Sequence, residues 1–122
     1  MTIQIKRNII EGIIEAARNT YPKEFFALLG SSDKKVIDEL IVVPAIYGFG
    51  HVLVQSYLIP IDFKIVGSVH SHPEKMNNPS SADIKSFSEF GDIHLIIAWP
   101  FDINSIQAYD VSGKPINWQV ID

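Results

Sequence analysis

Residues 69–83 read Val69-His70-Ser71-His72-Pro73-Glu74-Lys75-Met76-Asn77-Asn78-Pro79-Ser80-Ser81-Ala82-Asp83 and hold two of the four histidines of the chain. They follow an apolar run over residues 63–69, an order typical of a buried strand that enters a loop. Side chains two positions apart in a strand point to the same side, so His70 and His72 present their imidazoles to one place. Two histidines placed in this way supply half of a zinc site.

The composition is typical of a globular protein with an ordinary core. The 122 residues are 47% hydrophobic and 20% charged, with a formal net charge of −4. One domain over residues 1–122 is therefore expected. No basic cluster is present, which argues against nucleic acid as a partner. The chain has no cysteine, so any metal must be held by histidines and carboxylates.

No part of the sequence predicts contact with a membrane. Apolar stretches fall short of the roughly 20 residues that a membrane-spanning helix needs. Residues 1–7 mix polar and apolar side chains and lack the pattern of a signal peptide. A cytoplasmic protein is the expectation, and the sequence leaves the oligomeric state open.

Hydrophobic periodicity predicts two helices. Residues 8–20 carry apolar side chains every three to four positions, and a proline follows the segment. Asn8 is placed to cap this helix, with Glu11 reaching back in a variant of the capping box. Residues 81–90 repeat the helical pattern, and Gly91 is placed to terminate it.

About seven strands are expected around these helices. They are residues 25–29, 36–43, 51–59, 63–70, 93–99, 105–111 and 116–121. Residues 45–50 contain two glycines around Phe49 and are expected to form a mobile loop. Two helices among about seven strands, without repeats or linkers, predict an α+β or α/β fold in which helices pack on a single mixed β-sheet.

An aspartate at the start of the second predicted helix is a candidate third ligand. The loop of residues 73–79 can fold back so that Asp83 faces His70 and His72. Zinc accepts imidazole nitrogen and carboxylate oxygen alike, so this ligand set is chemically reasonable. Taken alone, Asp83 is most simply explained as a helix-start acid and Ser80 as a capping residue.

The histidine pair belongs to a longer pattern. His70-Ser71-His72-Pro73 is followed, after six residues, by Ser80-Ser81-Ala82-Asp83. Upstream, Pro22-Lys23-Glu24-Phe25-Phe26-Ala27-Leu28-Leu29-Gly30 places a glutamate before a buried strand that ends in glycine. Together these segments resemble the signature of the JAMM (MPN+) metalloproteases, apart from Ala27, where family members often have glycine. The resemblance covers nearly the whole chain and implies the MPN architecture, which is cytidine-deaminase-like.

The resemblance implies a role for five side chains. His70, His72 and Asp83 would hold one zinc ion per chain. Glu24 would take the proton of a zinc-bound water as general base and later deliver it to the leaving amine. Ser80 would donate a hydrogen bond to the developing oxyanion. The implied reaction is hydrolysis without a covalent enzyme intermediate.

Simpler roles stay open for several polar side chains. Without the resemblance, Glu24 is a solvated loop acid beside Lys23. Glu74 directly follows the proline of the motif but has no fixed position, so it is the less suitable base. His94 is expected to be a packed or half-exposed residue of a strand, and His51 to lie on a surface strand.

The resemblance also implies a substrate. JAMM enzymes cut the isopeptide or peptide bond after the C-terminal diglycine of ubiquitin-like proteins, and a chain of this size is expected to be a compact archaeal or bacterial form acting on a ubiquitin-like or sulfur-carrier protein. Residues 45–57 are the candidate strand edge and flap for the extended tail. Two alternatives remain: a metal-free MPN scaffold in a larger complex, and a zinc peptidase acting on small peptides or on a carrier C-terminus.

Overall fold

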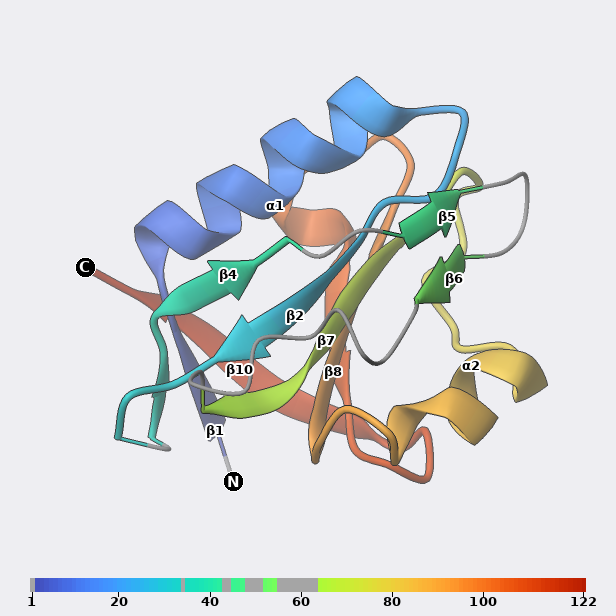
Figure 1. The fold of residues 1–122 in the computed structure, drawn as a ribbon. Coiled ribbons are helices and arrows are strands. Elements are labelled where there is room, and N and C mark those ends of the chain that lie inside the picture. Colours follow the sequence, from blue (N-terminus) through green and yellow to red (C-terminus); the bar gives the residue numbers. More distant parts are fainter. Residues whose placement is uncertain (1, 34, 43–44, 48–51, 55–63) are drawn as a thin grey trace.

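The computed structural model of the protein describes residues 2–33, 35–42, 45–47, 52–54 and 64–122 (Figure 1). Its elements are, in chain order, β1 (Thr2–Lys6), α1 (Arg7–Thr20), β2 (Phe26–Gly30), β3 (Val36–Ile37), β4 (Glu39–Ile41), β5 (Ala45–Tyr47), β6 (Val52–Val54), β7 (Ile65–His72), α2 (Ser81–Phe87), β8 (Ile93–Ala98), the 3-10 helix η2 (Ile103–Ser105), β9 (Ile106–Tyr109) and β10 (Pro115–Ile121). None of the helices among these residues is long and apolar enough to cross a membrane.

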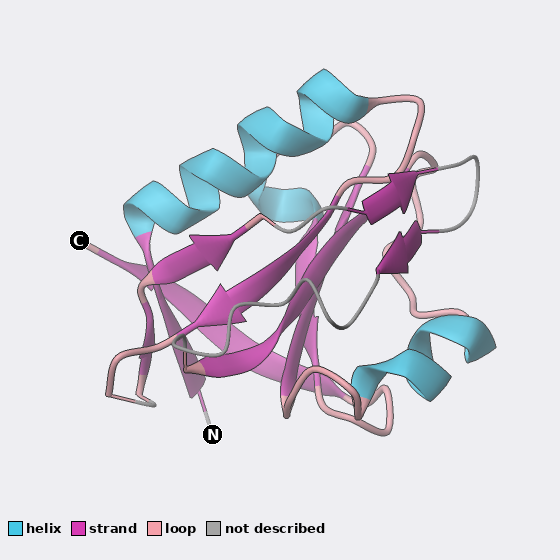
Figure 2. Cartoon of the chain, in the orientation of Figure 1, coloured by secondary structure: helices cyan, strands magenta, loops and turns pink. Residues whose placement is uncertain are grey.

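Eight of the strands form one mixed sheet, in the order β3-β1-β10-β9-β8-β7-β2-β4 (Figure 2). β5 and β6 form a separate antiparallel pair. Within the main sheet, β7 runs parallel to β8 on one side and antiparallel to β2 on the other. The predicted mixed sheet with packed helices is therefore confirmed, and the strand that ends in the two histidines lies inside it.

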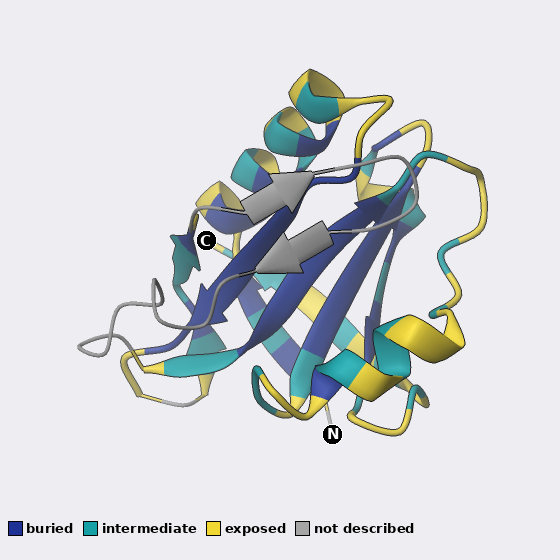
Figure 3. Cartoon of the chain, turned by 45° about the vertical axis from the view of Figure 1, so that its right-hand side comes forward, coloured by how far each residue is buried: buried dark blue, intermediate teal, exposed yellow. Residues whose placement is uncertain are grey.

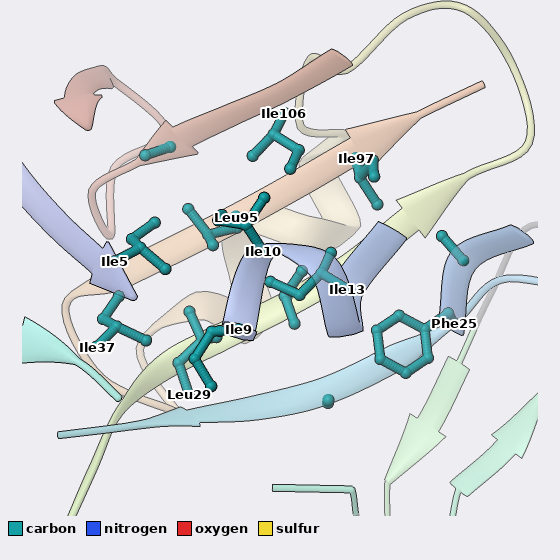
Figure 4. Packing of buried hydrophobic residues seen from close by; sticks show 14 of the residues in the cluster. Ile5, Ile9, Ile10, Ile13, Phe25, Leu29, Ile37, Leu95, Ile97 and Ile106 are labelled. Carbon is teal, nitrogen blue, oxygen red and sulfur yellow. The ribbon is translucent and has the colours of Figure 1, made fainter. Parts of the chain in front are cut away.

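α1 covers one face of the main sheet and supplies the larger core. Figure 4 shows Ile9, Ile10 and Ile13 packing over side chains of the strands. The buried residues of this helix are Ile9, Ile10, Ile13 and Ala17. Each buried aliphatic side chain of this size contributes about 1.5–3 kcal/mol relative to an exposed one. The periodic stripe predicted from the sequence thus holds α1 on the sheet.

The start of α1 differs from the prediction. The helix begins at Arg7, directly after β1, and Lys6 occupies the N-cap position without a side-chain hydrogen bond. The predicted cap of Asn8 and Glu11 is therefore wrong. Because β1 leads straight into α1, Asn8 lies inside the first turn rather than before it.

α2 packs on the opposite face of the sheet. Its buried residue Phe87 contacts Ile96 of β8, whereas the neighbours of Ile96 in β8 face α1. His70 pairs across the sheet with Ile96 and with Phe26 of β2, so its imidazole lies on the face that α2 covers. Figure 3 shows exposed and half-buried residues along α2, in contrast to the buried strands.

The segment predicted as one strand over residues 36–43 forms two short strands. β3 and β4 are separated at Asp38, and they pair with β1 and β2 respectively. These two strands stand at opposite ends of the sheet order, so the sheet curls until its edges are close. A strand was also missed at the N-terminus, where Ile3 and Ile5 of β1 alternate with polar residues and are buried.

Two further predictions need correction. Ala45–Tyr47 forms strand β5, paired with Val52–Val54 of β6, so the predicted loop is wrong for these three residues. Of the strand predicted over residues 51–59, Val52–Val54 forms β6, whereas His51 and residues 55–59 lie outside the described residues. Residues 48–50 of the predicted loop, and with them the rest of the candidate flap, lie outside the described residues as well. α2 ends at Phe87 instead of residue 90. Gly91, the predicted terminating residue, has a φ of 124°. A Cβ at this position would lie 2.3 Å from the Val66 carbonyl oxygen.

Candidate metal centre

The two histidines of the motif meet at the end of β7. His70 and His72 project from the same side of the strand, and their Nε2 atoms lie 3.1 Å apart. Their side chains are 8% and 17% exposed. β7 is hydrogen-bonded to a neighbour on each side at His70, through Phe26 of β2 and Ile96 of β8. The sheet therefore holds this pair in place.

Asp83 reaches the histidines from the start of α2. Its Oδ1 lies 3.3 Å from His70 Nε2, and its Oδ2 lies 3.2 Å from His72 Nε2. The Ser80 backbone N–H donates to Asp83 Oδ2 at 2.8 Å, and the Asp83 N–H donates to Ser80 Oγ at 3.1 Å. This capping box orients the carboxylate. The helix-start acid and the partner of the histidines are thus the same residue.

The donor atoms of these side chains fit a zinc ion. Ligand atoms about 2.1 Å from zinc at tetrahedral angles lie about 3.4 Å apart, close to the observed separations. His72 Nδ1 lies 3.1 Å from the Met76 carbonyl oxygen. Because a carbonyl only accepts, we assign the one proton of the neutral ring to Nδ1, which leaves a lone pair on Nε2; in the protonated ring Nε2 donates to Asp83 instead. A second hydrogen bond of this kind is typical of metal-binding histidines.

The same contacts shift the protonation of the cluster. Burial disfavours charge on Asp83, but hydrogen bonds from His70 and His72 outweigh it and hold the pKa of this carboxyl well below its usual range. Burial also opposes protonation of His72, yet its hydrogen bonds to Asp83 and to the Met76 carbonyl raise the pKa of the imidazole. A proton therefore competes with a metal for the Nε2 atom of His72, and metal affinity should fall as the pH is lowered.

Glu24 approaches the histidines from the segment before β2. It is 6% exposed, and a carboxylate oxygen and one ring nitrogen of each histidine lie within 4.8 Å of one another. The role of a solvated loop acid is therefore wrong for Glu24. The neighbouring Phe25 N–H donates to Ser71 Oγ at 2.7 Å, and the Ser71 N–H donates to the Phe25 carbonyl at 2.9 Å. These bonds tie the segment to β7 between the two histidines.

A cavity of about 360 Å³ opens beside the cluster. It is lined by Glu24, His72, Pro73, Glu74, Met76, Asn78, Pro79, Ser80 and Asp83. Glu74 is exposed, although its backbone carbonyl accepts a hydrogen bond from the Trp99 N–H at 2.9 Å. Glu24 is therefore the acid of the cavity that is both buried and next to the histidines.

Sequence reasoning missed the residues that support this site. Ser71 lies between the two histidines on the other side of the strand, and the alternation of β7 is the signal that could have found it. Tyr109 OH donates to the Asn77 carbonyl at 2.6 Å, and Asn77 Nδ2 donates to the Ser105 carbonyl at 3.1 Å. These bonds join the motif loop to β9 and to the end of η2 across a long sequence separation, which no local pattern indicates.

The prediction that His94 is a strand residue is confirmed, and of its two predicted environments, packed or half-exposed, the structure shows the packed one. Its side chain is fully buried in β8. Burial lowers the pKa of this imidazole to about 4, with a smaller effect from the nearby His70. His94 is therefore neutral at ordinary pH.

Comparisons with known proteins identify relatives of this chain. The family described as prokaryotic homologs of the JAB domain has a model that matches residues 6–112. A probable metalloprotease from Haloferax volcanii is 29% identical over 130 residues, covering 98% of this chain and 80% of that protein.

Several solved structures resemble this chain. A JAB1/MPN domain protein from Archaeoglobus fulgidus is 37% identical with a TM-score of 0.80, over 98% of this chain and 100% of that one. A structure described as JAMM, a metalloprotease-like zinc site in the proteasome and signalosome, is 34% identical with a TM-score of 0.79, and both chains are covered fully. A protein from Desulfitobacterium hafniense, 16% identical with a TM-score of 0.71 over 99% of this chain and 94% of that one, shares the fold.

Proposed function

The chain belongs to the prokaryotic homologs of the JAB domain, and from this membership we propose that it is a zinc-dependent isopeptidase. It hydrolyses the bond that follows the C-terminal diglycine of a ubiquitin-like or sulfur-carrier protein. One observation carries the proposal: the Nε2 atoms of His70 and His72 converge with the Asp83 carboxylate, beside the buried Glu24.

His70, His72 and Asp83 would hold one zinc ion per chain. When bound, zinc supplies Lewis acidity at the scissile carbonyl and acidifies water at the site. The protein contributes the fixed placement of these ligands. β7 supplies two of them from the sheet, and the capping box of α2 orients the third.

Glu24 acts as the base that receives the proton of the attacking water and returns it to the leaving amine. Its position next to the histidines and at the wall of the cavity suits this transfer, since a general base must lie within hydrogen-bond reach of the water it activates. Its burial also keeps bulk water from competing for the proton.

Ser80 donates a hydrogen bond to the developing oxyanion. As the N-cap of α2 its Oγ accepts from the Asp83 N–H, which uses one lone pair. A hydroxyl carries one hydrogen besides its lone pairs, so Ser80 can cap the helix and still donate into the cavity. A donor fixed before the reaction contributes more than one that must reorient.

The diglycine substrate rests on the family resemblance, and the alternatives differ in what they predict. A metal-free scaffold is disfavoured because all five polar positions of the motif are present. A zinc peptidase acting on small peptides or on a carrier C-terminus uses the same chemistry. The two enzymatic candidates therefore differ only in substrate.

The first experiment measures zinc in the purified protein and in His72→Ala by elemental analysis. Near-stoichiometric zinc in the wild type and its loss in the variant are expected. Lysine-linked conjugates of the diglycine-tailed proteins of the host are then incubated with the zinc-loaded protein, with and without a chelator. Cleavage that the chelator abolishes supports the proposal, cleavage of short peptides alone supports the small-peptide alternative, and absence of zinc rules out both.

A further inference from the structure

We infer that His94 is a positioning residue of the metal centre. Phe87 of α2 packs on its imidazole, and this contact determines where Asp83 lies relative to the histidines of β7. The inference rests on the proposed zinc site. It concerns a histidine that the proposed reaction does not use.

The imidazole of His94 is immobilised from both ends. Its Nε2 lies 2.7 Å from the Gly91 carbonyl oxygen, and its Nδ1 lies 2.8 Å from Ser68 Oγ. The carbonyl can only accept, so Nε2 carries the proton and the Ser68 hydroxyl donates to Nδ1. With both nitrogens engaged and the side chain fully buried, the ring cannot rotate without losing two hydrogen bonds.

Phe87 lies flat on this fixed ring. The two ring centroids are 4.1 Å apart and the ring planes are inclined by 4°. α2 is a helix of seven residues, and Phe87 is the one of them that is buried. The stack is therefore a principal attachment of this short helix to the sheet, together with the packing of Ile84 in the same cluster.

The stack and the ligand lie on the same side of α2. Asp83 and Phe87 are four positions apart, a spacing that places two side chains one above the other on a helix. The Ser86 hydroxyl donates to the Asp83 carbonyl at 2.9 Å and adds a bond within the same turn. A shift of Phe87 on the His94 ring therefore moves the Asp83 carboxylate as well.

The residue that orients His94 and the two histidine ligands belong to one row of β7. Ser68, His70 and His72 are two positions apart and project to the same face of the strand. Ser68 orients His94, while the histidines face the carboxylate. The sheet thus fixes two ligands directly, and it places the third through His94 and Phe87.

The alternative is that His94 only fills space between the sheet and α2. The test compares Phe87→Leu, His94→Asn and the double variant with Ile106→Val, a buried residue in the cluster on the α1 face. Zinc affinity is measured by competition with a chelator, and the stability of the metal-free proteins by urea unfolding. Hydrogen–deuterium exchange of the α2 amides reports local opening of the helix without metal.

We expect Phe87→Leu and His94→Asn each to weaken zinc binding about 10–100-fold, the range typical of residues that orient metal ligands. The double variant should bind about as weakly as the weaker single variant, because both changes break one contact. Exchange of α2 amides should accelerate in all three. Ile106→Val should lower stability and leave zinc affinity and α2 exchange unchanged.

Zinc affinities in Phe87→Leu and His94→Asn equal to that of Ile106→Val would overturn the inference. So would additive losses in the double variant. A wild-type protein that binds no zinc would instead contradict the proposed function, and in that case the α2 exchange rates alone decide whether His94 seats the helix.

Discussion

The two sides of the candidate metal centre are built differently. On the sheet side, Glu24 and His70 are buried, and β7 is hydrogen-bonded to a strand on each side. On the helix side, Asp83 is 19% exposed, Ser80 is exposed, and seven-residue α2 buries one side chain. Changes on the sheet side should therefore mainly remove a reacting group and lower the rate of hydrolysis. Changes on the lightly attached helix side should mainly displace the groups that α2 carries.

The largest effect is expected on the sheet side, from Glu24→Gln. The amide keeps the shape of the side chain but cannot receive a proton, so hydrolysis should fall about 10²–10⁴-fold with zinc retained. Glu74→Gln makes the same change in an exposed acid of the same cavity and should leave the rate within about threefold. Steady-state kinetics and elemental analysis check both. Full activity in Glu24→Gln would show that another group is the base.

On the helix side, Ser80 allows capping to be separated from oxyanion stabilisation. Ser80→Ala should lower kcat about 10²–10³-fold, the cost of removing one oxyanion donor. Ser80→Gly keeps most of the N-cap preference without any side-chain donor, and Ser80→Thr retains both the cap and the hydroxyl. If Ser80 donates to the oxyanion, the Gly variant should be as slow as the Ala variant, and the Thr variant close to wild type. A fast Gly variant would mean that Ser80 only caps α2.

Acid should weaken the junction between the two sides, where His94 lies. The pKa of His94 is about 4 in the folded protein against an ordinary value of 6.5. Below pH 6.5 the unfolded chain therefore binds a proton that the folded protein refuses, and stability falls until about pH 4. The slope approaches about 1.4 kcal/mol per pH unit, for a total of at most about 3.4 kcal/mol over the shift from 6.5 to about 4.

Urea unfolding of the metal-free protein across this range measures the loss. His72 and Asp83, the other residues of the site with a shifted pKa, act outside the window. The raised pKa of His72 adds stability that is complete below pH 6.5 and is lost as pH rises further, and the lowered pKa of Asp83 adds stability that is lost only below its ordinary value of 3.8. His94→Asn should flatten the slope between pH 6.5 and 4. An unchanged slope in that variant would assign the effect elsewhere.

The smallest effects come from one substitution made on each side. Ser71→Ala removes the acceptor of the buried Phe25 N–H, so the free energy of unfolding should fall by about 1–3 kcal/mol. Ser86→Ala removes a half-buried hydroxyl bonded to the preceding turn of α2. Alanine is the better helix former, so this loss should stay below about 0.5 kcal/mol. Equal losses in urea unfolding would contradict the difference between the two sides.

Local patterns in the sequence predicted much of the fold. The apolar stripe of α1, the apolar run of β7 and the helical start at Ser81 are all present in the structure. These predictions held because periodicity and capping depend on neighbours within a few residues. The break between β3 and β4 and the strand β1 were not predicted, because both depend on pairing with strands that are distant in the sequence.

The motif predicted the members of the candidate site, and their catalytic and ligand roles remain predictions. The sequence alone determined that His70 and His72 share one side of a strand, because alternation is a property of the backbone. Only the tertiary structure decided that Glu24 is buried beside them, through hydrogen bonds between Phe25 and Ser71, 46 positions apart. It also decided that Phe87 of α2 stacks on His94, since the contact of a helix with one face of a sheet depends on strand order rather than on sequence spacing.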